Sequence, residues 1–317
     1  MVVGVIPARL GSSRFPKKIL APLAGKPMVV HAVEQAQKSE KLDKIILAID
    51  SEETKRALAD FDFEIMMTDS NHISGTDRVA EVIKNIDDVE IVINIQGDEP
   101  LTDPKIIDGL IDTFKDPNVH MSTVVSRKLT VSDLLNPNIV KAILDENANA
   151  VEFKRNIFDL EIGGVYRHLG MYGFTRNALF QFTNLAPSKR EQERRLEQMR
   201  ALDNGLPIHA LITNCHHWAV DTKEDLAKVA HAFERAIQYQ NTHYEDAIAR
   251  MAKREGLSPE EFIDALSGLK VISQQDQALY LQDGKLLELL KTTHASLTSI
   301  GVITKPVCGT ECFTNVA

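Results

Sequence analysis

Apolar and polar positions follow two periods along the first two thirds of the chain. Short apolar runs rich in β-branched residues are typical of buried strands. The predicted strands are Val2–Ile6, Lys44–Ile49, Glu64–Met67, Glu90–Ile95, Val119–Ser126 and Pro207–Ile212. Between several of these runs, apolar residues recur at helical spacing, over residues 28–39, 51–60, 79–83 and 104–114. Because strands alternate with helices, the pattern predicts a doubly wound α/β fold with a mostly parallel sheet.

The pattern changes twice after residue 130. Two strand-like runs, Ile139–Leu144 and Ala150–Phe153, flank a polar turn and predict a β-hairpin. Beyond residue 232 the spacing is mostly helical, with a capping-box start at Ser258–Glu261, a helix stop at Gly268 and helical spacing over Lys285–Leu290. We therefore expect one domain over residues 1–232 and a helical C-terminal extension over 233–317, in which we find no catalytic motif.

Composition narrows the classes of function. The chain has 317 residues and a formal net charge of −9, which disfavours non-specific binding to nucleic acid or to membranes. No run is long and apolar enough to span a bilayer, so we expect a cytoplasmic protein. Three cysteines do not make a disulfide framework, and Cys308 and Cys312 lack the neighbouring ligands of a zinc site.

A basic loop follows the first predicted strand in this acidic chain. Within ten positions it carries Arg9, Ser12, Arg14 and Lys18, and a helix follows from Met28. Backbone N–H groups, arginine forks and a lysine together bind phosphate groups. The spacing fits neither a Walker A loop nor the dinucleotide fingerprint. The alternative is a solvated basic loop after an edge strand.

Two acidic positions are candidate magnesium ligands. Asp98 follows a predicted buried strand, at the edge where open α/β sheets bind ligands. Asp221 precedes Thr222 and Asp225, which have the spacing of a capping box, so Asp221 is either a ligand or part of a helix start. Another helix start lies at Ser74–Arg78, where we expect an N-cap at position 76 or 77.

Several of these segments carry a family resemblance. The loop reads Pro7-Ala8-Arg9-x-x-Ser12-x-Arg14-x-Pro16-x-Lys18, and Gln96-Gly97-Asp98-Glu99-Pro100, Arg167–Phe174 and Val220–Leu226 follow later. Together they resemble the 3-deoxy-manno-octulosonate cytidylyltransferase (CMP-Kdo synthetase) family. The resemblance covers about three quarters of the chain and ends near Phe233. It implies that CTP and an acidic octulosonate sugar react to a CMP-sugar and pyrophosphate, in lipopolysaccharide biosynthesis, and that the enzyme is a homodimer.

The resemblance also implies roles for individual residues. Nucleotide-binding residues would be Ala8, Arg9, Ser12, Arg14, Lys18, Ser74, Arg78 and Gln96. Asp98 and Asp221 would hold Mg²⁺, and with Arg9 and Lys18 they would form the catalytic set. Sugar-binding residues would be Arg155, His168, Tyr172, Glu197 and Gln198, the last two on a helix that includes Arg200.

The sequence departs from the family pattern near the predicted sugar pocket. Lys154 stands where the family has serine, and the loop over residues 156–165 is short. Two alternatives therefore stay open: the same chemistry on a modified sugar such as an 8-amino octulosonate, and a nucleotide sensor whose C-terminal extension binds a partner. The intact pair Asp98 and Asp221 favours an enzyme over a sensor.

Overall fold

The structure is a computed structural model that describes residues 1–12, 14–157, 164–216 and 218–266. The chain divides into two compact units, Met1–Ala227 and Lys228–Ala317. The predicted helical spacing over residues 285–290, the helix stop at Gly268 and the two C-terminal cysteines lie outside the described residues.

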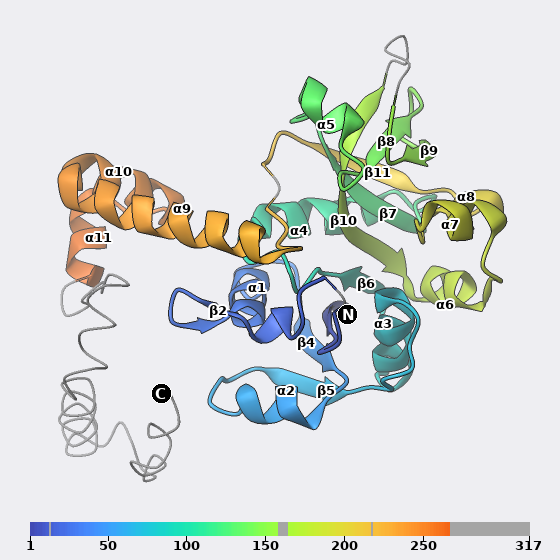
Figure 1. The fold of residues 1–317 in the computed structure, drawn as a ribbon, viewed down its shortest axis with the longest axis horizontal. Coiled ribbons are helices and arrows are strands. Elements are labelled where there is room, and N and C mark those ends of the chain that lie inside the picture. Colours follow the sequence, from blue (N-terminus) through green and yellow to red (C-terminus); the bar gives the residue numbers. More distant parts are fainter. Residues whose placement is uncertain (13, 158–163, 217, 267–317) are drawn as a thin grey trace. The chain divides into compact units, whose positions relative to one another are not determined.

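A single large sheet organises the first unit (Figure 1). Its main path runs in the order β11-β7-β10-β6-β1-β4-β5, and the hairpin strands β8 and β9 extend from β10. The strands are β1 (Val2–Ala8), β4 (Lys44–Ile49), β5 (Glu64–Met67), β6 (Ile91–Asn94), β7 (Met121–Ser126), β8 (Lys141–Leu144), β9 (Ala150–Lys154), β10 (Val165–Thr175) and β11 (His209–Thr213). A small separate ribbon joins β2 (Pro22–Leu23) to β3 (Lys26–Pro27).

Most neighbouring strands on this path are parallel, which confirms the predicted fold class. β1 pairs in parallel with β4 and β6, β4 with β5, and β7 with β11. The exception is β10, which is antiparallel to both β6 and β7. Parallel pairing requires a long crossover connection between the two strands. Strand β10 instead follows the β8–β9 hairpin directly and pairs antiparallel with β8 as well.

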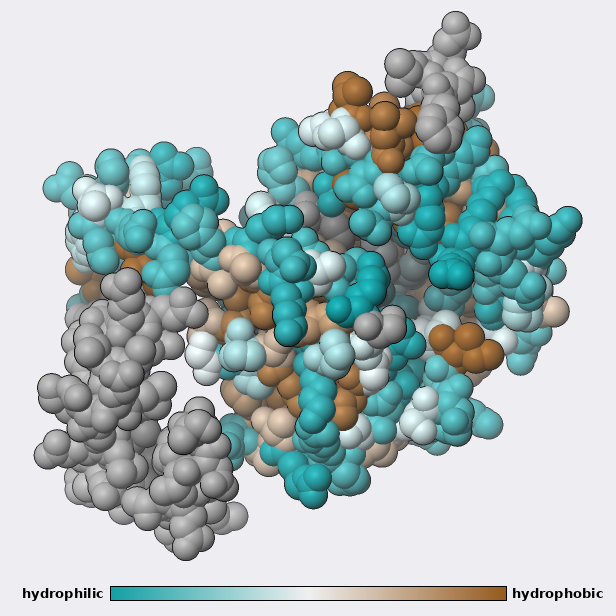
Figure 2. Space-filling view, in the orientation of Figure 1, coloured by the Kyte–Doolittle hydropathy of each residue, from teal (hydrophilic) through white to brown (hydrophobic). Residues whose placement is uncertain are grey.

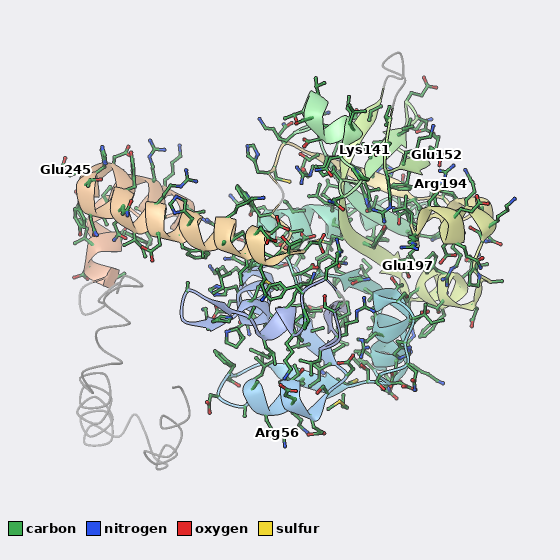
Figure 3. All side chains as sticks on the ribbon, viewed as in Figure 1. Arg56, Lys141, Glu152, Arg194, Glu197 and Glu245 are labelled. Atoms are coloured by element: carbon green, nitrogen blue, oxygen red, sulfur yellow. The ribbon has the colours of Figure 1, made fainter. Side chains whose placement is uncertain are left out.

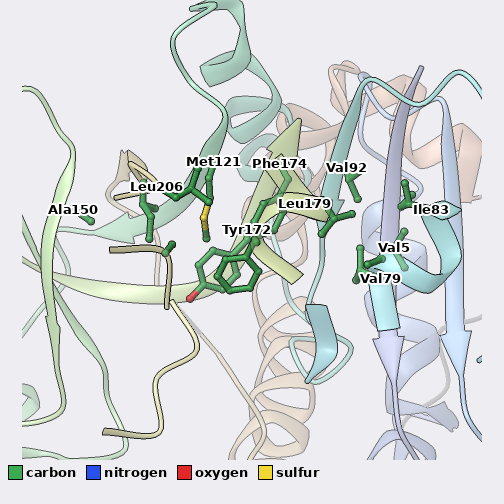
Figure 4. Packing of buried hydrophobic residues seen from close by; sticks show 14 of the residues in the cluster. Val5, Val79, Ile83, Val92, Met121, Ala150, Tyr172, Phe174, Leu179 and Leu206 are labelled. Atoms are coloured by element: carbon green, nitrogen blue, oxygen red, sulfur yellow. The ribbon is translucent and has the colours of Figure 1, made fainter. Parts of the chain in front are cut away.

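Helices cover both faces of the sheet because β1 alternates its apolar side chains between them. Val5 faces a core that contains Val79 of α3 (Gly75–Lys84) and Leu179 of α6 (Arg176–Asn184). Ile6 faces the other core, with Val29 of α1 (Met28–Ala36) and residues of α4 (Pro104–Asp112). Figure 4 shows side chains of the first core from Ala150 of β9 to Val5 of β1.

Shorter helices complete the first unit. They are the 3-10 turns Lys18–Leu20 and Thr113–Lys115, and the helices α2 (Glu52–Ala57), α5 (Val131–Leu135), α7 (Lys189–Arg194) and α8 (Met199–Asp203). On α5, Val131 and Leu135 are 77% and 57% exposed. Figure 2 shows this region as a brown patch at the top of the view.

The C-terminal extension is helical where it is described. α9 (Lys223–Thr242) contains the boundary between the two units, and α10 (Tyr244–Glu255) and α11 (Pro259–Leu266) follow. The predicted capping box is present, because Ser258 Oγ accepts from the N–H of Glu261 at 3.2 Å and a Glu261 carboxylate oxygen accepts from the N–H of Ser258 at 2.8 Å. Within the described residues, none of the helices is long and apolar enough to cross a membrane.

Candidate active site

A cleft of about 420 Å³ opens at the carboxyl edge of the sheet, beyond β1 and β6. The loop after β1, the start of α3 and the turn after β6 form most of its lining, and Glu197 and Asp221 complete it. Of the predicted site residues, those that line the cleft are Arg9, Ser12, Arg14, Lys18, Ser74, Arg78, Gln96, Asp98, Glu197 and Asp221. Those that do not are Ala8, Arg155, His168, Tyr172 and Gln198. The tertiary structure thus gathers residues that are up to two hundred positions apart.

The two predicted metal carboxylates meet at one lysine. Lys18 Nζ lies 2.6 Å from Asp98 Oδ2 and 3.3 Å from Asp221 Oδ1. Arg14 Nη2 also donates to Asp221 Oδ1, at 2.9 Å. Because both acids contact the same ammonium group, they lie on one side of the cleft, next to the basic loop.

Backbone contacts hold this acid pair in place. Asp98 follows β6 after Gly97, where an added Cβ would lie 3.3 Å from Ile6 Cγ2 and 3.4 Å from the carbonyl oxygen of Pro7. Glycine therefore permits the close approach of this turn to the end of β1. The N–H of Val220 donates to the carbonyl oxygen of Asp98 at 2.9 Å, which brings the neighbouring Asp221 to the same edge.

The helix after Asp221 is capped without its side chain. Thr222 Oγ1 accepts from the N–H of Asp225 at 3.2 Å, and Asp225 Oδ2 accepts from the N–H of Thr222 at 3.1 Å. Asp225 Oδ2 also accepts from the N–H of Asp221, at 3.3 Å. The Asp221 carboxylate, one third exposed, points to Arg14 and Lys18 instead. The sequence left two roles open for Asp221, a metal ligand or part of the helix start. Because its side chain does not cap the helix, the carboxylate is available to a ligand.

The donor set suits a hard divalent cation that keeps other ligands. Within the described residues no group of three or more His, Cys, Asp or Glu side chains gathers into a metal site. The protein would thus supply the two carboxylates Asp98 and Asp221, and phosphate oxygens and water would complete the shell. Mg²⁺ is commonly bound in this way, through one or two carboxylates and substrate phosphates.

The basic loop presents cations to the cleft. The guanidinium of Arg9 is exposed, and among the residues that the structure describes it has no hydrogen-bond or ion-pair partner. Lys17 adopts a left-handed backbone conformation (φ 55°) and its ammonium lies 2.5 Å from Glu53 Oε1, on α2. Lys17 therefore faces away from the acid pair, whereas Arg9 is available to an anionic ligand.

The opposite wall is the start of α3. Ser74 is the N-cap, because its hydroxyl oxygen accepts from the N–H of Asp77 at 3.1 Å and Asp77 Oδ2 accepts from the N–H of Ser74 at 3.2 Å. The prediction of an N-cap at Thr76 or Asp77 was wrong, since Asp77 instead occupies the third helical position of a capping box. This geometry fixes the Ser74 hydroxyl and Arg78 at the cleft wall.

Glu197 enters the cleft from the turn between α7 and α8. Burial raises the pKa of its carboxyl group, against the lowering effect of the Ser74 and Thr76 hydroxyls. Within the described residues its Oε1 atom is buried without a hydrogen-bond partner. Gln198 is also buried, but outside the cleft lining. Both residues precede α8, so the prediction that they lie on a helix was wrong.

His168 and Tyr172 lie on one face of β10, as the alternation predicted. His168 Nε2 is 2.9 Å from Thr123 Oγ1, and its ring centroid is 5.5 Å from that of Tyr172 and 5.0 Å from that of Phe153. Burial raises the pKa of Tyr172, and the charge of Glu197 raises it further. The two residues therefore belong to a buried aromatic row beside Glu197.

Arg155 is engaged with the main chain. Its Nε, Nη1 and Nη2 atoms each donate, at 3.0 Å, to the carbonyl oxygens of Arg194, Pro137 and Arg195 respectively. Burial and the nearby Arg14 lower its pKa. Each terminal nitrogen still has a second N–H group. Arg155 thus holds the turn between Arg194 and Glu197, two residues that Figure 3 labels.

Three polar residues that the sequence reasoning did not single out are also built into this region. Lys141 is fully buried and donates to the carbonyl oxygens of Asn136 (2.8 Å), Ile139 (2.7 Å) and Arg155. Burial, and then the charge of Asp98, raise the pKa of Glu99 to about 8. Asp50, at the end of β4, contacts two walls of the cleft. Glu99, beside Asp98, and Lys141 both stand in segments that resemble the family, whereas no sequence motif pointed to Asp50.

Comparisons with known proteins identify the family of the chain. The model of the family described as cytidylyltransferase matches residues 3–212. A 3-deoxy-manno-octulosonate cytidylyltransferase of Chloroherpeton thalassium is 43% identical over 234 residues, which cover 71% of this chain and 94% of the relative. One of Thermodesulfovibrio yellowstonii is 40% identical, over 71% of this chain and 95% of the relative.

The chain belongs to the 3-deoxy-manno-octulosonate cytidylyltransferase family. A solved structure of CMP:2-keto-3-deoxy-manno-octonic acid synthetase complexed with CTP agrees, with a TM-score of 0.69 and 32% identity over 74% of this chain and 98% of that one. A 4-diphosphocytidyl-2C-methyl-D-erythritol synthase from Anaerococcus prevotii shares the fold, with a TM-score of 0.51 at 14% identity. The family assignment therefore rests on most of the chain and not on the loop motif alone.

Proposed function

We propose that this cytidylyltransferase activates a 3-deoxy-manno-octulosonic acid with CTP and releases pyrophosphate. The observation that carries the proposal is the meeting of Asp98 and Asp221 at Lys18, in a cleft that Arg9 and Arg14 also line. Family membership supports the same reaction.

The reaction is a nucleotidyl transfer. An oxygen of the sugar hydroxyl at carbon 2 forms a bond to the α-phosphorus of CTP, the bond from that phosphorus to the bridging oxygen breaks, and pyrophosphate leaves with the electron pair. The hydroxyl proton is lost to solvent or to a nearby carboxylate. Because phosphoryl chemistry needs mainly positioning and charge neutralisation, the cations of the loop carry most of the catalysis.

Each part of the cleft has a role in this scheme. Arg9, Arg14 and Lys18 bind the triphosphate, with Arg9 as the cation that starts without a partner. Asp98 and Asp221 hold Mg²⁺, which when bound neutralises phosphate charge and lowers the pKa of the attacking hydroxyl. Before the ion binds, Lys18 balances the charge of the same two carboxylates.

The remaining residues of the cleft and its surroundings are assigned to the nucleoside and to the sugar. Ser74, Arg78 and Gln96 face the nucleotide, and Ala8 places the loop at the end of β1. The Glu197 carboxylate accepts hydrogen bonds from hydroxyl groups of the sugar, and Gln198, His168 and Tyr172 lie behind Glu197. Arg155 is assigned to the carboxylate of the sugar. These residue roles are extrapolated from the family resemblance to the positions described above.

Pyrophosphate release tests the proposal directly. Purified protein with CTP, Mg²⁺ and 3-deoxy-manno-octulosonate should release pyrophosphate, while ATP and GTP should be poor substitutes for CTP. The 8-amino octulosonate is assayed in parallel, because Lys154 replaces the serine of the family pattern near the predicted sugar pocket and left a modified sugar open as the substrate. No release with either sugar would contradict an enzymatic role and favour a nucleotide sensor.

We also propose that the enzyme is a cytoplasmic homodimer, since CTP is available in the cytoplasm. Val131 and Leu135 are exposed apolar residues four positions apart on α5, which places them on one helical face, and we propose this face as a contact between copies. Light scattering should give twice the chain mass, and Val131→Asp should lower it. A monomer at micromolar concentration would contradict this part of the proposal.

A further inference from the structure

Asp50 joins two walls of the cleft that are distant in sequence. It follows β4, next to the end of β1, and its side chain is 11% exposed. Its Oδ1 atom accepts from the backbone N–H of Leu10 at 2.9 Å. Its Oδ2 atom accepts from Arg78 Nη2 at 3.2 Å. One carboxylate therefore contacts both the basic loop and the first turn of α3.

Arg78 depends on this carboxylate. Its side chain is 3% exposed, and a buried guanidinium needs a counterion and hydrogen-bond acceptors to offset its desolvation. Arg78 Nη1 donates to Thr68 Oγ1, and the Thr68 hydroxyl in turn donates to the carbonyl oxygen of Ile49 at 2.7 Å. Asp50 supplies the charge and Thr68 supplies a neutral acceptor, so the position of Arg78 at the cleft wall is set by both.

The second contact of the Asp50 carboxylate is with the backbone N–H of Leu10. Leu10 directly follows Arg9, the cleft cation that has no partner among the described residues. The bond from its N–H to Asp50 fixes the main chain one residue beyond Arg9, and hydrogen bonds to charged acceptors are stronger than neutral ones. The loop cannot move relative to Arg78 without lengthening one of the two Asp50 contacts.

We propose that Asp50 is a positioning residue that couples the phosphate-binding loop to Arg78 and so sets the preference of the cleft for one pyrimidine base. Arg78 offers only N–H donors, which match the acceptor atoms O2 and N3 of cytosine and oppose the N3–H of uracil. The coupling aligns this donor with the triphosphate held by the loop. The inference rests on the proposed nucleotide site, although its test does not require turnover.

Binding measurements with two probes separate the two contacts. Titration calorimetry with inorganic triphosphate and Mg²⁺ reports the loop, and the ratio of the affinities for CTP and UTP reports the base side. Asp50→Asn keeps the size of the side chain and removes its charge. It should weaken triphosphate binding and lower the CTP preference, each by about tenfold, the scale of one charged hydrogen bond.

Two variants provide matched controls. Asp43 Oδ2 accepts from the N–H of Val2 at 2.7 Å, the same kind of bond at the other end of the β1–β4 pair, so Asp43→Asn should change neither readout. Thr68→Val removes the neutral partner of Arg78, so it should lower the CTP preference and leave triphosphate binding unchanged. A purely structural role for Asp50 predicts a lower melting temperature with an unchanged CTP preference.

An Asp50→Asn variant that folds and leaves either readout unchanged would overturn the coupling. If that variant does not fold, Asp50→Glu is measured instead, because it keeps the charge and displaces both contacts; unchanged values there would also overturn it. Wild-type protein that binds CTP without transferring it would refute the proposed function alone. Wild-type protein that binds CTP and UTP equally would refute the role of Asp50 in base preference.

Discussion

Replacing Asp221 by asparagine tests the acid pair most directly. The change keeps the shape of the side chain and removes one of the two carboxylates that contact Lys18. At an effective dielectric constant of 20, a unit charge at the 3.3 Å separation of Asp221 and Lys18 interacts with about 5 kcal/mol. Because Asp221 is one third exposed, water screens part of this interaction.

For the loss of transition-state stabilisation we expect about 3 kcal/mol, the scale of one preorganised electrostatic contact. It corresponds to a decrease in kcat of roughly 150-fold at saturating Mg²⁺ and CTP. Asp98→Asn should have a similar effect, and the double variant should lose less than the sum, since both acids contact one lysine and would share the proposed Mg²⁺. Thermal stability should change little, because partly exposed ion pairs contribute little to folding.

Pyrophosphate release measures kcat, and a melting curve checks the fold. Asp112→Asn is the matched control: this carboxylate is 37% exposed and lies 2.8 Å from Lys115, on α4 and away from the cleft. Its kcat should equal that of the wild type. If Asp221→Asn also turned over at the wild-type rate, the metal assignment would be refuted, since Thr222 already caps the helix.

Three further predictions follow from other parts of the site. In the folded state the pKa of Glu99 is about 8, against an ordinary value of 4.5, so between these pH values the folded state binds more protons than the unfolded state. The free energy of unfolding should therefore fall as the pH rises from about 5 to 8. Urea titrations should show a weaker fall for the Glu99→Gln variant. Arg155→Ala should raise the KM for the sugar about tenfold and the KM for CTP far less in initial-rate assays, and an effect on CTP alone would place Arg155 on the nucleotide side. A chain that ends after residue 255 should still bind CTP in calorimetry, and a folded truncation without CTP binding would show that the C-terminal extension contributes to the site.

The local chemistry of the cleft was readable before the fold was known. The apolar run before Pro7 predicts a strand and the cations after it predict an anion-binding loop. Both predictions use only neighbouring residues, because a strand, a loop and a helix within about 30 residues form one structural unit. The same holds for the capping boxes at Thr222 and Ser258, which depend on residues three positions apart. The alternation of strands and helices likewise predicted the parallel sheet.

Errors arose where two local solutions compete or where distant segments decide the outcome. At the start of α3, Ser74 and Thr76 are both good N-caps, and the reciprocal bond with Asp77 selects Ser74. Glu197 precedes α8 because Arg195 adopts a left-handed conformation (φ 53°) and its carbonyl oxygen is held by Arg155, forty residues earlier. No pattern near residue 197 contains that information.

Strands, the basic loop after β1 and the acidic positions Asp98 and Asp221 could be predicted from the sequence, since they depend on neighbours along the chain. Tertiary structure alone decided which of them meet. Lys18 contacts both Asp98 and Asp221 because the segments after β1 and β6 meet at one edge of the sheet and the N–H of Val220 donates to the carbonyl oxygen of Asp98. Asp50 reaches Leu10 and Arg78 for the same reason: β4 lies beside β1, and hydrogen bonds form between groups that are close in space, whatever their separation in sequence.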